Sequence, residues 1–162
     1  MFNIRIVLYL KLIFFISLIA IISAYFIEYV LGHQPCNLCL IERIPYLLAM
    51  ILIVVNYFFL NNEKFLILLL VVTFIFSLSV SIYHFGIEND FFEESAICKL
   101  QDLTEFITKE EILEQLKVKT VSCKDVTFKI FGFSLTTINI FLNLFIIILL
   151  INIYKNYEMF KK

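Results

Sequence analysis

Long apolar runs broken by short polar segments form the dominant pattern along this chain. A helix needs roughly 20 mostly apolar residues to cross the hydrocarbon core of a membrane. Four segments reach this length, and we expect transmembrane helices at about residues 12–31, 38–60, 65–87 and 130–154. The pattern therefore predicts an all-α membrane protein, a four-transmembrane-helix bundle that forms a single membrane domain over residues 1–162.

Helices fit these segments better than the alternatives do. A helix pairs its own backbone polar groups, which lipid cannot hydrogen-bond. The strands of a membrane barrel would alternate apolar and polar residues, and the run FLILLLVVTFIF in the third segment does not. The first segment has basic residues before it, as a signal peptide would. Its apolar run is longer than the roughly 7–15 residues of a signal-peptide core, so we expect a retained helix.

The polar segments between these helices differ greatly in length. A short loop spans 32–37, a tight turn spans 61–64, and a long polar loop spans 88–129. Within the long loop, TKEEILEQLK opens with Thr and Glu at the spacing of a capping box and continues with apolar residues at helical spacing. We expect a short amphipathic helix at residues 108–117.

Composition agrees with a membrane protein. Hydrophobic residues make up 62% of the chain and charged residues 17%, against about 45–50% and about 25% in soluble domains. The formal net charge of -1 gives no reason to expect nucleic-acid binding.

The helix order places all four cysteines on one face of the membrane. The first and third connections lie on the same side, because two helices return the chain to the face it left. Cys36 and Cys39 end the first connection, and Cys98 and Cys123 lie in the long loop. Four cysteines in a chain of this length can form two pairs.

Basic residues indicate which face this is, because they prefer the cytoplasm. The face opposite the cysteines carries Arg5, Lys11, Lys64, Lys155, Lys161 and Lys162. The long loop also contains six lysines, so the raw count does not decide. The first pair of helices decides the orientation, because its N-terminal flank is basic and its loop has no Lys or Arg before Arg43. We therefore expect both termini in the cytoplasm and the cysteines in an oxidising compartment, in a bacterium the periplasm.

Cys36 and Cys39 form a C-x-x-C motif at the start of the second helix. Residues 45–60 alone span about 24 Å at the helical rise, less than the roughly 30 Å core, so the helix should begin near Leu38. A helix N-terminus favours a thiolate, the attacking species in thiol–disulfide exchange. Two other readings stay open: two structural disulfides in a membrane scaffold without enzymatic activity, and a zinc site of all four cysteines. The spacing of the second pair is not that of a zinc ribbon, and we expect no metal.

Arg43 follows Cys39 by four residues and so lies on the same helix face, one turn deeper. An intramembrane arginine is a candidate functional residue. It would bind the polar head group of a lipid-soluble electron acceptor, for which a quinone is the natural choice. Alternatively, Arg43 is an interfacial anchor or an ion-pair partner of Glu42 or Glu28.

Other polar residues of the spans have structural readings. Thr73, Ser77 and Ser81 recur every four residues and predict a small-residue seam for close helix contact. Asn139 and Asn143 share one face of the last helix and are placed to hydrogen-bond across the bundle.

Four stretches together resemble the disulfide bond formation protein B family, the quinone-linked disulfide generators of bacterial inner membranes. They are PCNLCLIERIPY (35–46), YHFGIE (83–88), the single Cys98, and SCKDVTFKIFGFSLTTIN (122–139). The resemblance covers nearly the whole chain, and the order of the motifs along four helices is its specific part. Vitamin K epoxide reductase-like proteins share a four-helix bundle and a C-x-x-C motif, but there the loop cysteines precede that motif.

The resemblance implies roles for individual residues. Cys98 and Cys123 would be the mobile pair that meets a thioredoxin-like periplasmic oxidase, and Cys36 and Cys39 the pair beside the quinone. The candidates for binding the quinone are Arg43, Glu42 and His84, of which His84 has packing as its alternative role.

The family reading implies a specific reaction. The protein would reoxidise a DsbA-like oxidase and pass the electrons through both cysteine pairs to ubiquinone or menaquinone. Two family features differ here. The Pro-x-Cys sequence that is common at the last family cysteine appears as VSC, with Ser122 before Cys123. The following aromatic residue, often tryptophan in the family, is Phe128.

Overall fold

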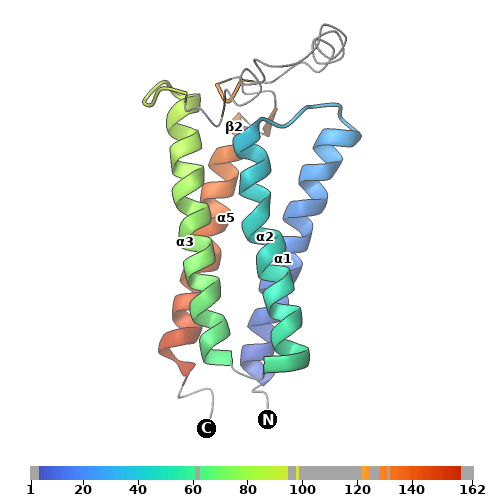
Figure 1. Ribbon diagram of the computed structural model, residues 1–162, viewed down its shortest axis with the longest axis vertical. Helices are drawn as coiled ribbons and strands as arrows, with labels where there is room; N and C mark the ends of the chain where they lie inside the picture. Colours follow the sequence, from blue (N-terminus) through green and yellow to red (C-terminus); the bar gives the residue numbers. More distant parts are fainter. Residues whose placement is uncertain are drawn as a thin grey trace, which may run out of the picture.

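The computed structural model describes residues 4–60, 63–94, 98, 122–124, 128–130 and 132–157. The predicted amphipathic helix at 108–117 lies outside the described residues. Four long helices dominate the fold (Figure 1): α1 (Ile4–Tyr29), α2 (Asn37–Val55), α3 (Glu63–Glu88) and α5 (Leu135–Lys155). A π-helical turn, η1 (Asn56–Leu60), continues α2, and two short strands, β1 (Lys129–Ile130) and β2 (Phe133–Ser134), precede α5.

All four helices are long and apolar enough to cross a membrane, which confirms the predicted all-α architecture. Their outer faces carry large apolar side chains that are mostly exposed, such as Leu8, Val72 and Phe141. Water would not tolerate so large an apolar surface on a monomer, whereas lipid covers it at no cost. The predicted four-helix bundle is therefore a membrane bundle with a lipid-facing exterior.

The bundle is built around α3, which packs against both α2 and α5, while α1 packs mainly against α2. The main core contains Ile13 from α1, Ala49 from α2, Phe74 from α3 and Leu150 from α5, each with no exposed surface. Ser77 and Ser81 of the predicted seam are also fully buried. Thr73, the first residue of the predicted seam, is half-buried, so two of its three positions are fully buried.

Two helix starts differ from the predicted boundaries. The first helix begins at Ile4 rather than near residue 12, because the polar residues before Leu12 continue the helix instead of preceding it. The last begins at Leu135 rather than near residue 130. Strands β1 and β2 pair as a tight antiparallel hairpin through Gly132, which has φ +88°. The Ser134 hydroxyl then accepts from the Thr137 amide at 3.2 Å and caps α5.

The two chain ends lie at the same end of the bundle, and the C-x-x-C motif and hairpin lie at the other (Figure 1). This agrees with the predicted placement of all four cysteines on the face opposite the termini. A second, smaller core at this end includes Cys36, Leu38, Ile87 and Cys123, with Cys98 packed beside them.

Candidate functional site

Cys36 and Cys39 occupy the first turn of α2. Cys36 is the N-cap residue, with extended backbone angles, and its sulfur accepts from the Cys39 amide at 3.3 Å. Both are free cysteines, and their sulfur atoms lie 2.8 Å apart. Cys36 lies just outside the transmembrane span. Hydrogen bonding from the Cys39 side chain lowers the pKa of Cys36 to about 5, against the opposing effect of burial and with further help from His84. Cys36 therefore lies at the helix N-terminus, as the sequence predicted, and its lowered pKa favours the thiolate form.

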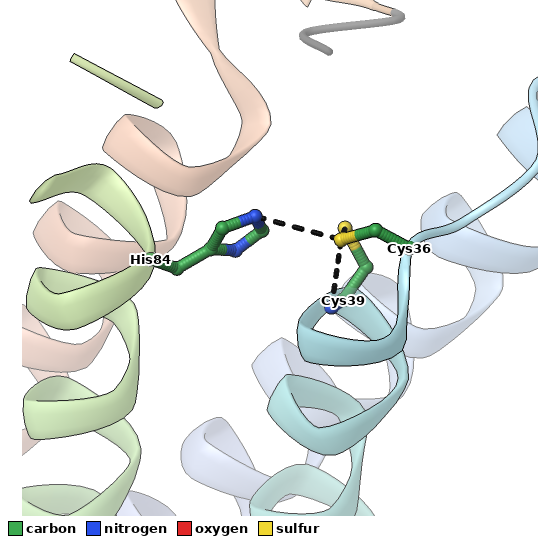
Figure 2. A group of neighbouring side chains, drawn as sticks. All are labelled: Cys36, Cys39 and His84. Atoms are coloured by element: carbon green, nitrogen blue, oxygen red, sulfur yellow. Dashed lines mark hydrogen bonds between the residues drawn. The ribbon is translucent and has the colours of Figure 1, made fainter. Parts of the chain in front are cut away.

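His84 on α3 connects this pair to an acidic network. Its ring is 2% exposed, with Nε2 3.5 Å from the Cys36 sulfur (Figure 2) and Nδ1 3.0 Å from a Glu42 carboxylate oxygen. The Asn139 amide donates to the other Glu42 oxygen at 2.9 Å. Because a carboxylate only accepts hydrogen bonds, Nδ1–H donates to Glu42, and Nε2 faces the Cys36 sulfur. The structure thus brings together three residues that the sequence placed in separate motifs.

Two further residues of this network were not singled out from the sequence. Glu88 lies one turn after His84, and its Oε1 atom is 3.9 Å from Nε2. Thr136 donates to the same Glu88 oxygen at 2.5 Å, and its hydroxyl is 3.4 Å from His84 Nδ1. The available signals were the i, i+4 spacing of His84 and Glu88 in YHFGIE, and the repeated hydroxyls in SLTTIN.

The network continues into the bundle through the last helix. The Asn139 and Asn143 amides both donate to Ser81, at 2.9 and 3.4 Å. The Tyr46 hydroxyl lies within hydrogen-bonding distance of both amide oxygens. The predicted cross-bundle role of the two asparagines is therefore confirmed, and Asn139 links the packing network to Glu42.

Arg43 pairs with an acidic residue of the first helix. Its Nη1 donates to Glu28 Oε2 at 2.6 Å, and the guanidinium carbon lies 5.0 Å from the centre of the Tyr25 ring. Of the two acidic partners considered from the sequence, Glu28 makes this contact, while Glu42 turns toward His84.

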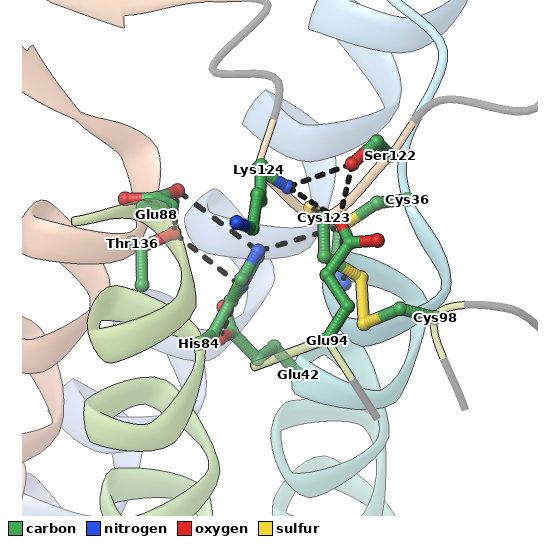
Figure 3. Close-up of a disulfide and its surroundings, with 11 residues drawn as sticks. Cys36, Glu42, His84, Glu88, Glu94, Cys98, Ser122, Cys123, Lys124 and Thr136 are labelled. Carbon is green, nitrogen blue, oxygen red and sulfur yellow. Dashed lines mark hydrogen bonds and ion pairs between the residues drawn. A yellow bond between two sulfur atoms is a disulfide. The ribbon is translucent and has the colours of Figure 1, made fainter. Parts of the chain in front are cut away.

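Cys98 and Cys123 form a disulfide whose Cα atoms are 5.9 Å apart. Figure 3 shows this disulfide near Cys36 and to one side of His84 and its partners. The Glu94 carboxylate accepts from Ser122 and from the Lys124 amide, so Ser122 secures the segment that holds Cys123. Lys124 pairs with Asp90, whose carboxylate raises the pKa of the lysine.

A largely apolar cavity of about 460 Å³ joins these groups. Its wall includes Ile16, Ala20 and Ile27 from α1 and Ile138 and Leu142 from α5. The polar or reactive members of the wall are Ser23, His33, Gln34, Cys36, Cys39, Glu42, Arg43, Tyr46, His84, Glu88, Cys123, Thr136 and Asn139. All the residues chosen from the sequence except Cys98 therefore meet at one cavity.

Two comparisons place the chain among known proteins. The family model described as "Disulfide bond formation protein DsbB" matches residues 7–153. A protein of Rickettsia prowazekii (strain Madrid E), named "Uncharacterized protein RP370", is 32% identical over 137 residues, which cover 83% of this chain and 80% of the relative. No solved structure matches the chain. The family match over most of the chain, together with four transmembrane helices and two neighbouring cysteine pairs, shows that the protein belongs to the DsbB family of membrane disulfide-generating oxidoreductases.

Proposed function

We propose that this protein reoxidises a periplasmic, DsbA-like oxidase of thioredoxin fold and delivers the electrons to a membrane quinone, ubiquinone or menaquinone. The observation that carries the proposal is the meeting of two chemically different cysteine pairs at one apolar cavity. One pair is bonded and the other is free, and they share a single small core. A scaffold with two structural disulfides does not require the two cysteine pairs to lie close together.

The relay consists of two disulfide exchanges. The reduced oxidase attacks the Cys98–Cys123 disulfide and leaves as a disulfide, so that its two thiols become the thiols of Cys98 and Cys123. These thiols then reduce a Cys36–Cys39 disulfide and close their own bond again. Each step moves two electrons and two protons, and no other reactant is needed.

Cys98 is the better point of attack for the oxidase. Cys123 is only 2% exposed, whereas Cys98 is partly exposed at the rim of the same core. Because exchange requires access to the attacked sulfur, an incoming thiolate reaches Cys98 more readily. Cys123 is then the leaving thiol, and it borders the cavity beside Cys36.

The cavity suits a quinone. The surface of its wall is mainly apolar, as a ring with an isoprenoid tail requires and as in most cofactor sites. Arg43 and His84 are the residues that would hold the polar ring oxygens, with Glu42 fixing His84. When bound, a quinone accepts the two electrons and two protons released as Cys36 and Cys39 form a disulfide. The thiolate of Cys36 takes part in this closure, and His84 is placed to hold a proton at Nε2 beside that sulfur.

In the membrane, this arrangement requires the cysteine end to face the periplasm and both chain ends to face the cytoplasm of a bacterial inner membrane. The basic N-terminal flank and the uncharged first loop before Arg43 support this orientation.

A quinone-reduction assay tests the proposal. Purified protein is mixed with a reduced thioredoxin-fold oxidase and ubiquinone, and the quinone absorbance is followed for the wild type and for each Cys→Ser variant. All four variants should lose turnover. If the wild type leaves the quinone unchanged, or if Cys36→Ser turns over like the wild type, the relay is wrong.

Thiol trapping separates the relay from a scaffold with structural bridges. Acid quenching during turnover, followed by a mass-tagged maleimide, should label all four cysteines in a fraction of the molecules. In a scaffold, any disulfide would stay closed throughout, and the labelled fraction would not change when the oxidase is added.

A further inference from the structure

Cys36, Cys39 and His84 converge in a way that also suits a metal ion. Their ligand atoms all lie within 4.8 Å of one another, and two of the three residues are buried. In a tetrahedral site with metal–sulfur bonds of about 2.3 Å and metal–nitrogen bonds of about 2.0 Å, neighbouring ligand atoms are about 3.5–3.8 Å apart. The 3.5 Å between the Cys36 sulfur and His84 Nε2 already matches. The two sulfurs, at 2.8 Å, need to separate by about 1 Å.

The histidine is prepared as a ligand by its other nitrogen. Metal-binding histidines usually donate their second ring N–H to a carboxylate or carbonyl, which fixes the tautomer and the ring orientation. Glu42 stands 3.0 Å from Nδ1 in that role, and Asn139 holds Glu42 in turn at 2.9 Å. Nε2 is the ring nitrogen that faces the sulfurs (Figure 2), and it can bind an ion once it has released its proton.

The surroundings leave room for a fourth ligand. All three residues border the cavity, so an ion between them has an open side. Glu88 lies beyond His84, with Oε1 3.9 Å from Nε2. Thiolate and imidazole together favour soft or borderline ions such as Zn²⁺ and Cu⁺ over Mg²⁺ or Ca²⁺.

We propose that Cys36, Cys39 and His84 form a binding site for a thiophilic metal cation of the Zn²⁺ or Cu⁺ class when both thiols are reduced, and that the bound ion blocks closure of the Cys36–Cys39 disulfide. Binding releases to solvent whatever protons the two thiols and Nε2 carry and moves no electrons, so the sulfurs remain at the thiol oxidation level. The binding step requires only the reduced pair. Only its effect on turnover rests on the proposed relay. The site differs from the four-cysteine zinc site considered from the sequence, because Cys98 and Cys123 are bonded to each other.

Zinc binding is measured on full-length protein in detergent that carries Cys98→Ser and Cys123→Ser, so that Cys36 and Cys39 are its only thiols. The reduced protein, without oxygen, competes with a chromophoric chelator for Zn²⁺. We expect one Zn²⁺ per chain. X-ray absorption at the zinc edge should show two sulfur neighbours and an imidazole nitrogen, a result that does not depend on any substitution within the site.

Three substitutions in this background identify the ligands. Glu42→Gln should weaken zinc affinity about 10- to 100-fold, as loss of a carboxylate behind a ligand histidine does elsewhere, and His84→Gln should weaken it more. His33→Gln is the matched control. His33 is the only other histidine of the chain and lines the same cavity, but it packs against Phe128. This control should bind zinc unchanged.

The blocking effect is measured with diamide, a chemical oxidant of thiols, so that neither quinone nor oxidase is involved. Zinc-loaded protein should form the Cys36–Cys39 disulfide at least tenfold more slowly than metal-free protein, and a chelator should restore the rate. The site is refuted if the protein does not bind zinc or if the zinc absorption spectrum shows no imidazole nitrogen. It is also refuted if His33→Gln and His84→Gln lower the zinc affinity equally. Unchanged diamide oxidation refutes the block. A failed quinone-reduction assay would instead refute the relay and leave the metal result standing.

Discussion

Arg43 on α2 donates to the carboxylate of Glu28 on α1, with Nη1 2.6 Å from Oε2. Both side chains are mostly buried, at 13% and 20% exposed. The contact does not exhaust the arginine, because a guanidinium has five N–H donors in a fixed plane. Arg43 also borders the cavity. The ion pair therefore holds the guanidinium at the cavity wall and leaves donors available for a ligand.

The first prediction concerns quinone binding by Arg43. Arg43→Met keeps the length of the side chain and removes its donors and charge. A hydrogen bond to a charged group contributes about 1.5–3 kcal/mol, so the KM for quinone should rise roughly 10- to 100-fold. The KM for the reduced oxidase, which meets the other cysteine pair, should stay near the wild-type value. Steady-state kinetics with each substrate varied in turn measures both.

A double variant controls for the acid left behind. Arg43→Met alone leaves the partly buried carboxylate of Glu28 without its ion-pair partner. Combining Glu28→Gln with Arg43→Met removes both charges. If the arginine contacts the quinone, the single and double variants should share the raised KM. Recovery of the wild-type KM in the double variant would show that the unpaired glutamate, rather than the lost contact, caused the change.

The second prediction concerns the reactivity of Cys36 as a function of pH. With a pKa of about 5, the reduced thiol is ionised at neutral pH. Its alkylation by iodoacetamide should be half-maximal near pH 5, should fall as the pH drops below that value, and should level off above about pH 6. An ordinary thiol, with a pKa near 8.5, would still be gaining reactivity at pH 8. In the Cys98→Ser, Cys123→Ser background only Cys36 and Cys39 can be alkylated, and peptide mapping assigns the measured alkylation rate to Cys36.

Cys39→Ala tests the cause of this shift. The hydrogen bond from Cys39 has the largest lowering effect on the pKa of Cys36. Its removal should move the midpoint of the alkylation profile to higher pH, toward that of an ordinary cysteine. An unmoved midpoint would assign the shift to the helix N-terminus and His84 instead.

The sequence predicted the helices well because the membrane imposes a simple rule on them, namely a length and a continuous apolar composition. It also placed Cys36 and Cys39 correctly, since the length needed to cross the lipid required a helix start before Pro45. The rule carries no information on a short polar hairpin, so the start of α5 was predicted five residues too early.

The contacts within the site could not be predicted in the same way. His84, Glu42 and Thr136 come from three helices, and their meeting depends on how each helix is rotated about its axis. Arg43 had two possible acidic partners in the sequence, Glu42 and Glu28. The rotation of α2 directs Glu42 to His84 and Asn139, and leaves Arg43 to Glu28.

The third prediction concerns the buried amide at the centre of the network. Asn139→Leu keeps the approximate volume but removes the donor to Glu42 and to Ser81. Leaving buried polar groups without a partner costs about 1–3 kcal/mol, so thermal unfolding in detergent should begin at a lower temperature. Ser17→Ala is a suitable control. Ser17 is fully buried, and its hydroxyl has no hydrogen-bond partner among the described residues, so its removal should leave the Tm unchanged or raise it.

The fourth prediction concerns close packing where α3 ends. The carbonyl of Gly86 accepts from the amides of Phe91 and Phe92, at 2.8 and 3.2 Å, as the chain turns back. This turn lays the Phe92 ring over Gly86, so that a methyl group at position 86 would overlap the ring. Gly86→Ala should therefore lower the Tm, because overpacking of this kind typically costs about 1–3 kcal/mol. Thermal unfolding followed by far-UV circular dichroism measures the change.

Removal of the Phe92 side chain should reverse the effect of Gly86→Ala on the Tm. Alanine favours a helix over glycine by about 1 kcal/mol, a gain that the Phe92 ring conceals. In a Phe92→Ala background the ring is absent, and the same Gly86→Ala change should raise the Tm. If Gly86→Ala lowers the Tm equally in both backgrounds, then the ring is not the obstacle. The contact between Gly86 and the Phe92 ring would then not be what fixes the turn that leads from α3 toward Glu94 and the disulfide.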